Sequence, residues 1–173
     1  MISKKMLGVF VLSMAISSAA YTQNLLNVQE WLPGSGGTTS FIMNGSVGEN
    51  SREWGVSPYG QRAVLWKATP AVNNDGDGGW NTTPVSINNQ QMYRLSVWVK
   101  KTVSNSGTTY LGCDNVNRLD GTYQDNPYFW WGDLPQLDKW YLLVAYIHGN
   151  GDTNCTLWRD LRWCYGDQGV ELY

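Results

Sequence analysis

Apolar and polar positions alternate with a period of two between residues 92 and 101 of this 173-residue chain. Side chains of an extended strand point alternately to opposite faces, so this period indicates a strand with one buried face. The two expected faces are Tyr93, Leu95, Val97 and Val99 toward a core, and Arg94, Ser96, Trp98 and Lys100 away from it. The alternation predicts a half-buried β-strand.

Other short apolar runs are separated by Gly, Asn, Asp and Pro, and none repeats with the helical period outside the first twenty residues. These runs predict further strands over 63–68, 108–113, 127–131 and 140–148, and a weaker one over 156–165. The run WYLLVAYIH (140–148) is apolar at its odd and its even positions, and thus on both faces of a strand. This pattern is typical of a central strand covered on both faces. The turn sequence SNSG (104–107) predicts a hairpin between 92–101 and 108–113.

Strands at this spacing without helices predict an all-β fold, either a two-sheet β-sandwich or a jelly roll. A jelly roll needs about eight strands. The weak C-terminal run therefore leaves open whether this sequence contains the closing strand. Residues 1–20 combine Lys4 and Lys5 with a short apolar stretch and a small-residue ending, as in a cleaved signal peptide. We expect an exported protein with one domain over 21–173, located outside the cell, at its surface or in a periplasm, and without membrane insertion.

The chain contains ten Trp and ten Tyr but only three Phe. Trp and Tyr join an apolar ring to a polar tip, which suits partly exposed recognition surfaces. Small sandwiches also use Trp in their cores, so the enrichment alone does not decide between the two uses. The formal net charge is −2, and it becomes −4 without Lys4 and Lys5. This balance argues against nucleic acid as a partner.

The aromatic residues favour sugar binding, because pyranose rings present apolar C–H faces to aromatic rings while their hydroxyls take directional hydrogen bonds. Trp98 and Arg94 share the outward face of their strand, unless a loop covers that face. Trp54 and Tyr59 lie in SREWGVSPYG, whose Gly and Pro predict a loop. Asp133 follows the aromatic run and could accept a hydrogen bond from a ligand.

The segment NPYFWWGDLP (126–135) is framed by two prolines, which argue against a central strand position. We expect an edge strand or an ordered loop. Strict alternation would turn Phe129 and Trp131 inward and leave Tyr128 and Trp130 on the surface. Tyr128 and Trp130 therefore join the candidate sugar-binding residues.

Three segments together carry a family resemblance: EWLPGSGG (30–37), INNQQMYRLSVWVKK (87–101) and DKWYLLVAYI (138–147). Over residues 25–150 the chain resembles galactose-binding-like jelly-roll domains, such as secreted carbohydrate-binding modules of the family 4, 9 and 22 type. Similar domains occur in surface adhesins and phage tail fibres. The resemblance implies a non-catalytic module that binds a polysaccharide or glycan. The alternative is a structural or adhesive module whose partners are other surface proteins.

Two kinds of chemistry have weaker support. Asp75 and Asp77 in NNDGDG could hold a structural calcium ion, although the sequence lacks the glutamate that completes an EF-hand loop, and an ordinary Asx turn is the favoured explanation. A polysaccharide-degrading enzyme would need paired carboxylates, for which Glu49 and Glu53 are the candidates, with the single histidine, His148, as a further catalytic candidate. Cys113, Cys155 and Cys164 allow three alternative disulfide pairings in an oxidising compartment.

Overall fold

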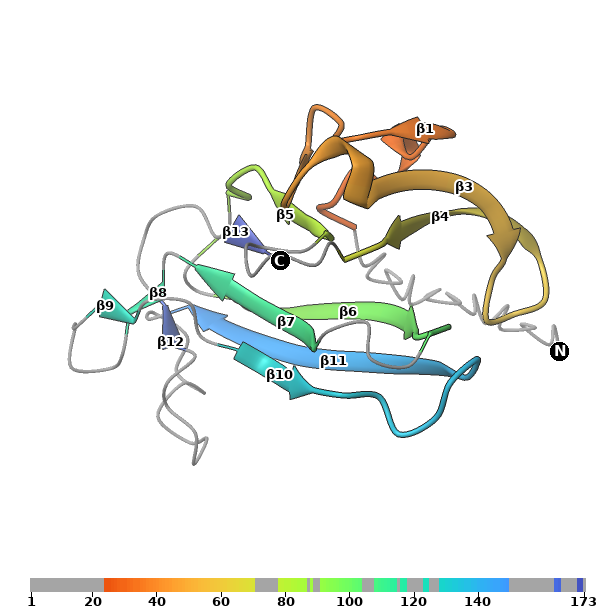
Figure 1. Cartoon of the computed structure of the whole chain (residues 1–173). Helices are drawn as coiled ribbons and strands as arrows, with labels where there is room; N and C mark the ends of the chain where they lie inside the picture. Colours follow the sequence, from red (N-terminus) through yellow and green to blue (C-terminus); the bar gives the residue numbers. More distant parts are fainter. Residues whose placement is uncertain are drawn as a thin grey trace, which may run out of the picture.

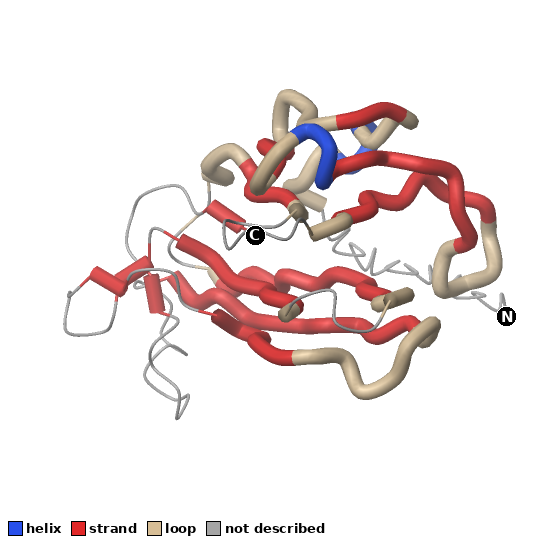
Figure 2. The backbone as a smooth tube through the Cα atoms, viewed as in Figure 1, coloured by secondary structure: helices blue, strands red, loops and turns tan. Residues whose placement is uncertain are grey.

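The computed structural model describes residues 24–70, 78–86, 88, 91–103, 108–114, 116–117, 123–124, 128–149, 164–165 and 171–172. The regular structure in these stretches is extended, apart from the short 3-10 helices η1 (Val28–Glu30) and η2 (Val47–Glu49) (Figure 2). The strands are β1 (Gly34–Ser35), β2 (Phe41–Met43), β3 (Asn50–Val56), β4 (Arg62–Ala68), β5 (Trp80–Thr82), β6 (Met92–Lys100), β7 (Thr109–Asp114), β8 (Val116–Asn117), β9 (Tyr123–Gln124), β10 (Tyr128–Gly132), β11 (Trp140–Gly149), β12 (Cys164–Tyr165) and β13 (Glu171–Leu172). The predicted all-β sandwich is confirmed.

The strands lie in two layers (Figure 1). In the upper layer β1, β3 and β4 form one sheet, and β2 pairs with β5 beside it. In the lower layer β6 and β11 pair antiparallel over nine positions, and β7 pairs antiparallel with β10 and β13. β10 contacts β11, so the pairings place the four long strands of this layer in the order β6, β11, β10, β7.

The strands predicted over 63–68, 92–101, 108–113, 127–131 and 140–148 correspond to β4, β6, β7, β10 and β11. The hairpin predicted across SNSG does not form among the described residues, since β6 pairs with β11 and β7 pairs with β10 and β13. Of the weak run 156–165, only β12 lies within the described residues. Residues 1–20 lie outside them, so the signal peptide stays a prediction.

The main core lies on the inner side of the lower layer. It consists of buried side chains from β6, β7 and β11, namely Leu95, Leu111, Cys113, Leu143, Ala145 and Ile147. Tyr93, Val97 and Val99 pack against this cluster, as the alternation in β6 predicts. Trp80 packs against it from β5, so the two layers share the core. Burial of each large side chain contributes about 1.5–3 kcal/mol.

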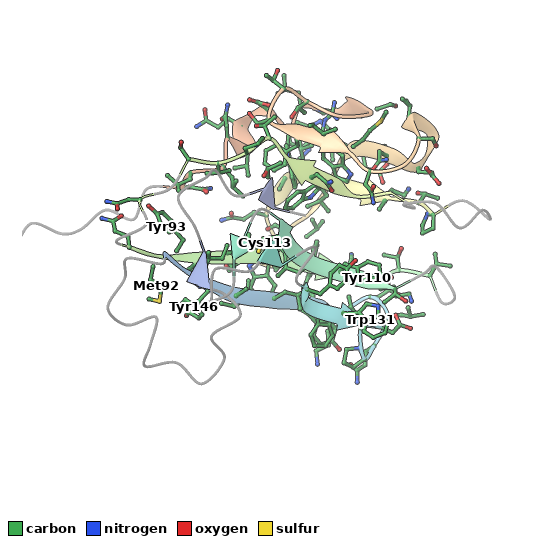
Figure 3. All side chains as sticks on the ribbon, turned by 90° about the vertical axis from the view of Figure 1, so that its left-hand side faces the viewer. Met92, Tyr93, Tyr110, Cys113, Trp131 and Tyr146 are labelled. Atoms are coloured by element: carbon green, nitrogen blue, oxygen red, sulfur yellow. The ribbon has the colours of Figure 1, made fainter. Side chains whose placement is uncertain are left out.

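The outer face of β11 does not follow the prediction. Leu142, Val144 and Tyr146 are 40%, 41% and 40% exposed, so the strand is buried on one face only. Figure 3 shows Tyr146 and Met92 on the side of the layer opposite Tyr93. Apolar side chains can occupy solvent-facing positions, and for this reason apolar composition at both parities does not imply burial of both faces.

Four aromatic rings fill the upper layer, with centroids 5.2–6.2 Å apart: Trp31, Phe41, Trp66 and Trp80. Asn50, which is 1% exposed, lies beside this cluster. Its amide oxygen accepts hydrogen bonds from the Trp66 indole (3.0 Å) and the Gly79 backbone N–H (2.9 Å). Its amide nitrogen donates to two backbone oxygens, those of Asn44 and Ser46. A buried polar side chain is tolerated here because every group has a partner.

Residues 51–60 were expected to form a loop, but residues 50–56 form β3 and pair with β4 at seven positions. Arg52 explains the error, because it occupies an inward position of the strand with a charged side chain. Its guanidinium is buried over the Trp66 ring and donates to the backbone oxygens of Leu32, Gly36 and Gly37. Charged residues at inward positions hide a strand from a search for apolar alternation.

Candidate functional site

Tyr59 and Trp98 meet at the surface although they are 39 residues apart in the sequence. Tyr59 lies in the turn between β3 and β4, and Trp98 lies on β6. Their ring centroids are 5.8 Å apart at an interplanar angle of 81°, an edge-to-face arrangement. The Trp98 indole N–H donates to the Tyr59 hydroxyl oxygen at 3.2 Å. Two of the predicted sugar-binding residues are thus brought together.

Hydrogen bonds within the turn hold Tyr59 in position beside Trp98. The Ser57 hydroxyl accepts hydrogen bonds from the backbone N–H groups of Tyr59 (3.3 Å) and Gln61 (3.2 Å), which fixes the turn. Both rings remain accessible: Tyr59 is 72% exposed and Trp98 is 36% exposed. The outward orientation predicted for Trp98 is therefore correct. The Tyr59 hydroxyl accepts one hydrogen bond and keeps its own proton as a donor.

Trp54 lies on β3 and not in the predicted loop. Its side chain is 53% exposed, and the Arg62 guanidinium lies 4.2 Å from its ring centroid. Such a cation–π contact at an exposed site contributes about 0.5–1 kcal/mol and orients the indole. Trp54 is therefore an exposed, oriented ring near the hairpin end.

The aromatic run in β10 contains a β-bulge, which reverses the prediction for its two tryptophans. Tyr128 pairs with Gly112, but Trp130 pairs with Leu111 and Trp131 with Tyr110, so the register shifts between Tyr128 and Trp130. An extra residue in one strand interrupts the alternation of side chains. Trp130 therefore packs against the core and Trp131 is 69% exposed. The outward orientation predicted for Trp130 is therefore wrong, and Trp131 is the exposed tryptophan of this strand.

The bulge leaves Tyr128 and Trp131 outward together, next to Tyr110 of β7. The rings of Tyr110 and Tyr128 lie 5.1 Å apart at an angle of 40°, and both residues are about half exposed. We call Tyr110, Tyr128 and Trp131 the β7–β10 cluster; Figure 3 labels Tyr110 and Trp131. Tyr110 was not among the predicted residues, although alternation with its apolar neighbours Leu111 and Cys113, which are buried, indicates its outward position.

The two residues predicted to hydrogen-bond a sugar, Arg94 and Asp133, differ in whether they already have a partner in the fold. Arg94 is exposed on the outer face of β6 opposite Tyr146, and it makes no hydrogen bond or ion pair among the described residues. Asp133 instead pairs with the ammonium of Lys101. The hydrogen bond from Lys101 is the main reason that the pKa of Asp133 lies below its usual value. Asp133 thus joins the end of β10 to the end of β6.

The carboxylates considered for catalysis have structural partners. Glu49 is buried and accepts a hydrogen bond from the Ser46 backbone N–H as part of a capping box of η2. Glu53 is exposed and forms an ion pair with Lys67 at 3.1 Å. His148 is in register with Met92 at the end of β11.

Asp75 and Asp77 lie outside the described residues. Within the described part of the chain, His, Cys, Asp and Glu side chains form no group of three or more that could hold a metal ion. Nor does this part contain a helix long and apolar enough to cross a membrane. A cavity of about 290 Å³ lies elsewhere, lined among others by Leu26, Phe41, Thr82 and Val85, and the exposed aromatic residues do not line it.

Comparisons of the chain with protein-family models, with curated protein sequences and with solved structures found no match. What the surface binds must therefore be inferred from its own chemistry.

Proposed function

We propose that this protein is an exported, non-catalytic carbohydrate-binding module. The observation that supports the proposal best is the Tyr59–Trp98 pair, in which two distant chain segments hold two aromatic rings in a defined relation at the surface. An aromatic residue that served only the core would be covered. These two rings are instead oriented and accessible.

The pair offers both kinds of contact that a pyranose requires. An exposed ring face stacks on the C–H face of the sugar, and a polar tip near its rim bonds to a hydroxyl. The Tyr59 hydroxyl supplies such a donor while it accepts from Trp98. The resemblance to galactose-binding-like modules points to the same class of ligand. Each ring is already ordered, so little side-chain entropy is lost on binding.

A glycan array tests the proposal with the wild-type chain and the variants Trp98→Ala and Tyr59→Ala. We expect the wild type to bind a restricted set of glycans and each variant to lose at least about tenfold in affinity, because stacking area disappears. Leu32→Ala is the matched control, since Leu32 is an apolar side chain that is 68% exposed, precedes β1 in the upper layer and contributes no ring to the pair. A wild-type protein that binds no glycan, or variants that bind as well as wild type, would refute the proposal.

A further inference from the structure

The outer face of the lower layer carries a row of exposed apolar and aromatic side chains across its four long strands. From β6 through β11 and β10 to β7, the row contains Trp98, Leu142, Val144, Tyr128, Trp131 and Tyr110. These residues are 36–69% exposed. Six large, exposed apolar side chains on one face of a domain make that face a candidate interaction site. Trp98 also belongs to the Tyr59–Trp98 pair, so the proposed sugar site lies at one end of this face.

The shape of the face limits what it can hold. None of its aromatic rings lines the cavity described above, and the rings lie on an open sheet. A single sugar needs a concave site to bury most of its surface. An open row of rings instead suits several successive units of a chain, each of which contributes a small contact area. This arrangement favours binding to sugar units within a polymer chain over binding to its terminal sugar.

The charged side chains on this face favour one class of polymer over others. Among the outward strand positions whose side chains the structure describes, two hold cations, Arg94 and Lys100, and none holds a carboxylate, although acidic residues outnumber basic ones in the whole chain. Asp133, just beyond the end of β10, is exposed but pairs with Lys101. Lys100 lies 5.1 Å from the Trp140 ring centroid, whereas Arg94 has no described partner. A second copy of the chain would bring like charges together. An acidic ligand would instead pair with them.

From these observations we propose that the outer face binds an extended polysaccharide with carboxylate groups, which means a polymer that contains uronic acids. The inference rests on the proposed carbohydrate-binding function and assigns its substrate class. Aromatic rings of the β7–β10 cluster and Trp98 stack on the sugar rings. The Arg94 guanidinium, with its planar set of donors, binds a carboxylate through two parallel hydrogen bonds. Polymers of high sulfate or phosphate density require dense Lys and Arg clusters, and this face has only two cations.

Affinity electrophoresis of the full chain in gels that contain polygalacturonate or alginate tests the proposal. The matched probe is the same polymer with its carboxyl groups esterified, because the backbone is unchanged and the charge is removed. We expect retardation by at least one acid form, weakening by about tenfold or more on esterification, and further weakening from low to high salt. Galacturonic acid as a monosaccharide should compete at least about a hundredfold more weakly than its polymer.

Two variants locate the site. Trp131→Ala should weaken binding to the polymer about tenfold or more, and Arg94→Gln should weaken binding to the acid form while it leaves the weaker binding to the ester unchanged. Lys67→Gln is the control, because Lys67 is an exposed cation on β4 of the upper layer, outside this face, and among the described residues pairs only with Glu53. Circular dichroism of each variant checks that the fold is retained.

The possible failures differ from one another. If the wild type binds neutral glycans and Trp131→Ala and Arg94→Gln have no effect, the outer face is not the site, while the proposed function survives. If no glycan of any kind binds, both proposals fail. If sedimentation shows self-association that Trp131→Ala abolishes, the face joins copies of this chain. Retardation by single-stranded nucleic acid that Arg94→Gln abolishes would likewise overturn the assignment to a polysaccharide.

Discussion

The indole N–H of Trp98 donates to the hydroxyl of Tyr59, and through this contact the turn between β3 and β4 reaches the edge strand of the lower layer. The hydrogen bond fixes the angle between two exposed rings, whose planes are 81° apart. The upper layer thus supplies one ring of the proposed sugar site and the lower layer supplies the other. Binding should therefore depend on how the layers are held together as well as on the rings themselves.

The first prediction separates the hydrogen bond from the stacking surface. Trp98→Phe keeps an aromatic ring but removes the N–H, whereas Trp98→Ala removes both. An exposed neutral hydrogen bond contributes about 0.5–1.5 kcal/mol, so Trp98→Phe should lower glycan affinity by at most about tenfold. Calorimetric titration with a glycan chosen from the array measures both variants. Equal losses for Phe and Ala would show that ring stacking does not contribute.

Much of the lower layer could be predicted from the sequence, because β6, β7 and β11 are long and their inward residues are apolar. The strand β3 could not be, since Asn50 and Arg52 occupy buried positions with polar groups whose partners are known only once the chain has folded. The two tryptophans of β10 were assigned to the wrong faces for a different reason, whereas Tyr128 is exposed as predicted. A bulge changes the parity of a strand, and nothing in the letters YFWWG marks where it occurs.

The bulge predicts opposite effects for two adjacent tryptophans. Trp130→Ala should lower the free energy of unfolding by about 2–4 kcal/mol, because it leaves a cavity beside the core. Trp131→Ala should change it by less than about 0.5 kcal/mol, because Trp131 is 69% exposed. Urea unfolding followed by circular dichroism measures both. Strict alternation without a bulge predicts the reverse order, so the pair decides between the two registers.

The buried arginine predicts a specific loss of stability in the upper layer. Arg52→Leu removes the donors for the backbone oxygens of Leu32, Gly36 and Gly37 and leaves these oxygens without their partner. We expect a loss of about 2–4 kcal/mol in urea unfolding, since a hydrogen bond from a charged donor makes a net contribution of about 1.5–3 kcal/mol and part of the loss is regained where the freed oxygens bind water. Arg62→Leu is the control and should cost about 1 kcal/mol or less, because only an exposed cation–π contact is lost. Equal effects would mean that Arg52 does not anchor the loop.

The hydrogen-bonded carboxylate of Glu30 should make the stability of the folded chain depend on pH. Its carboxylate accepts hydrogen bonds from the Ser40 hydroxyl (2.7 Å) and the Ser40 backbone N–H (2.8 Å), and these bonds lower its pKa to about 2. The folded chain thus favours the ionised form more than the unfolded chain does, where the carboxyl keeps its ordinary pKa of about 4.5. The stabilisation is complete above about pH 4.5 and is lost as the pH falls from there toward 2.

This dependence can be isolated with Glu30→Gln, which keeps the shape but cannot ionise. Melting temperatures of the wild type and the variant should differ most at neutral pH and converge as the pH approaches 2, with the wild type the more stable above pH 4.5. Glu53→Gln serves as the control, since Glu53 forms only an exposed ion pair with Lys67, and its variant should follow the wild type closely. A difference between wild type and Glu30→Gln that stays constant from pH 7 to 2 would show that ionised Glu30 does not stabilise this segment through Ser40.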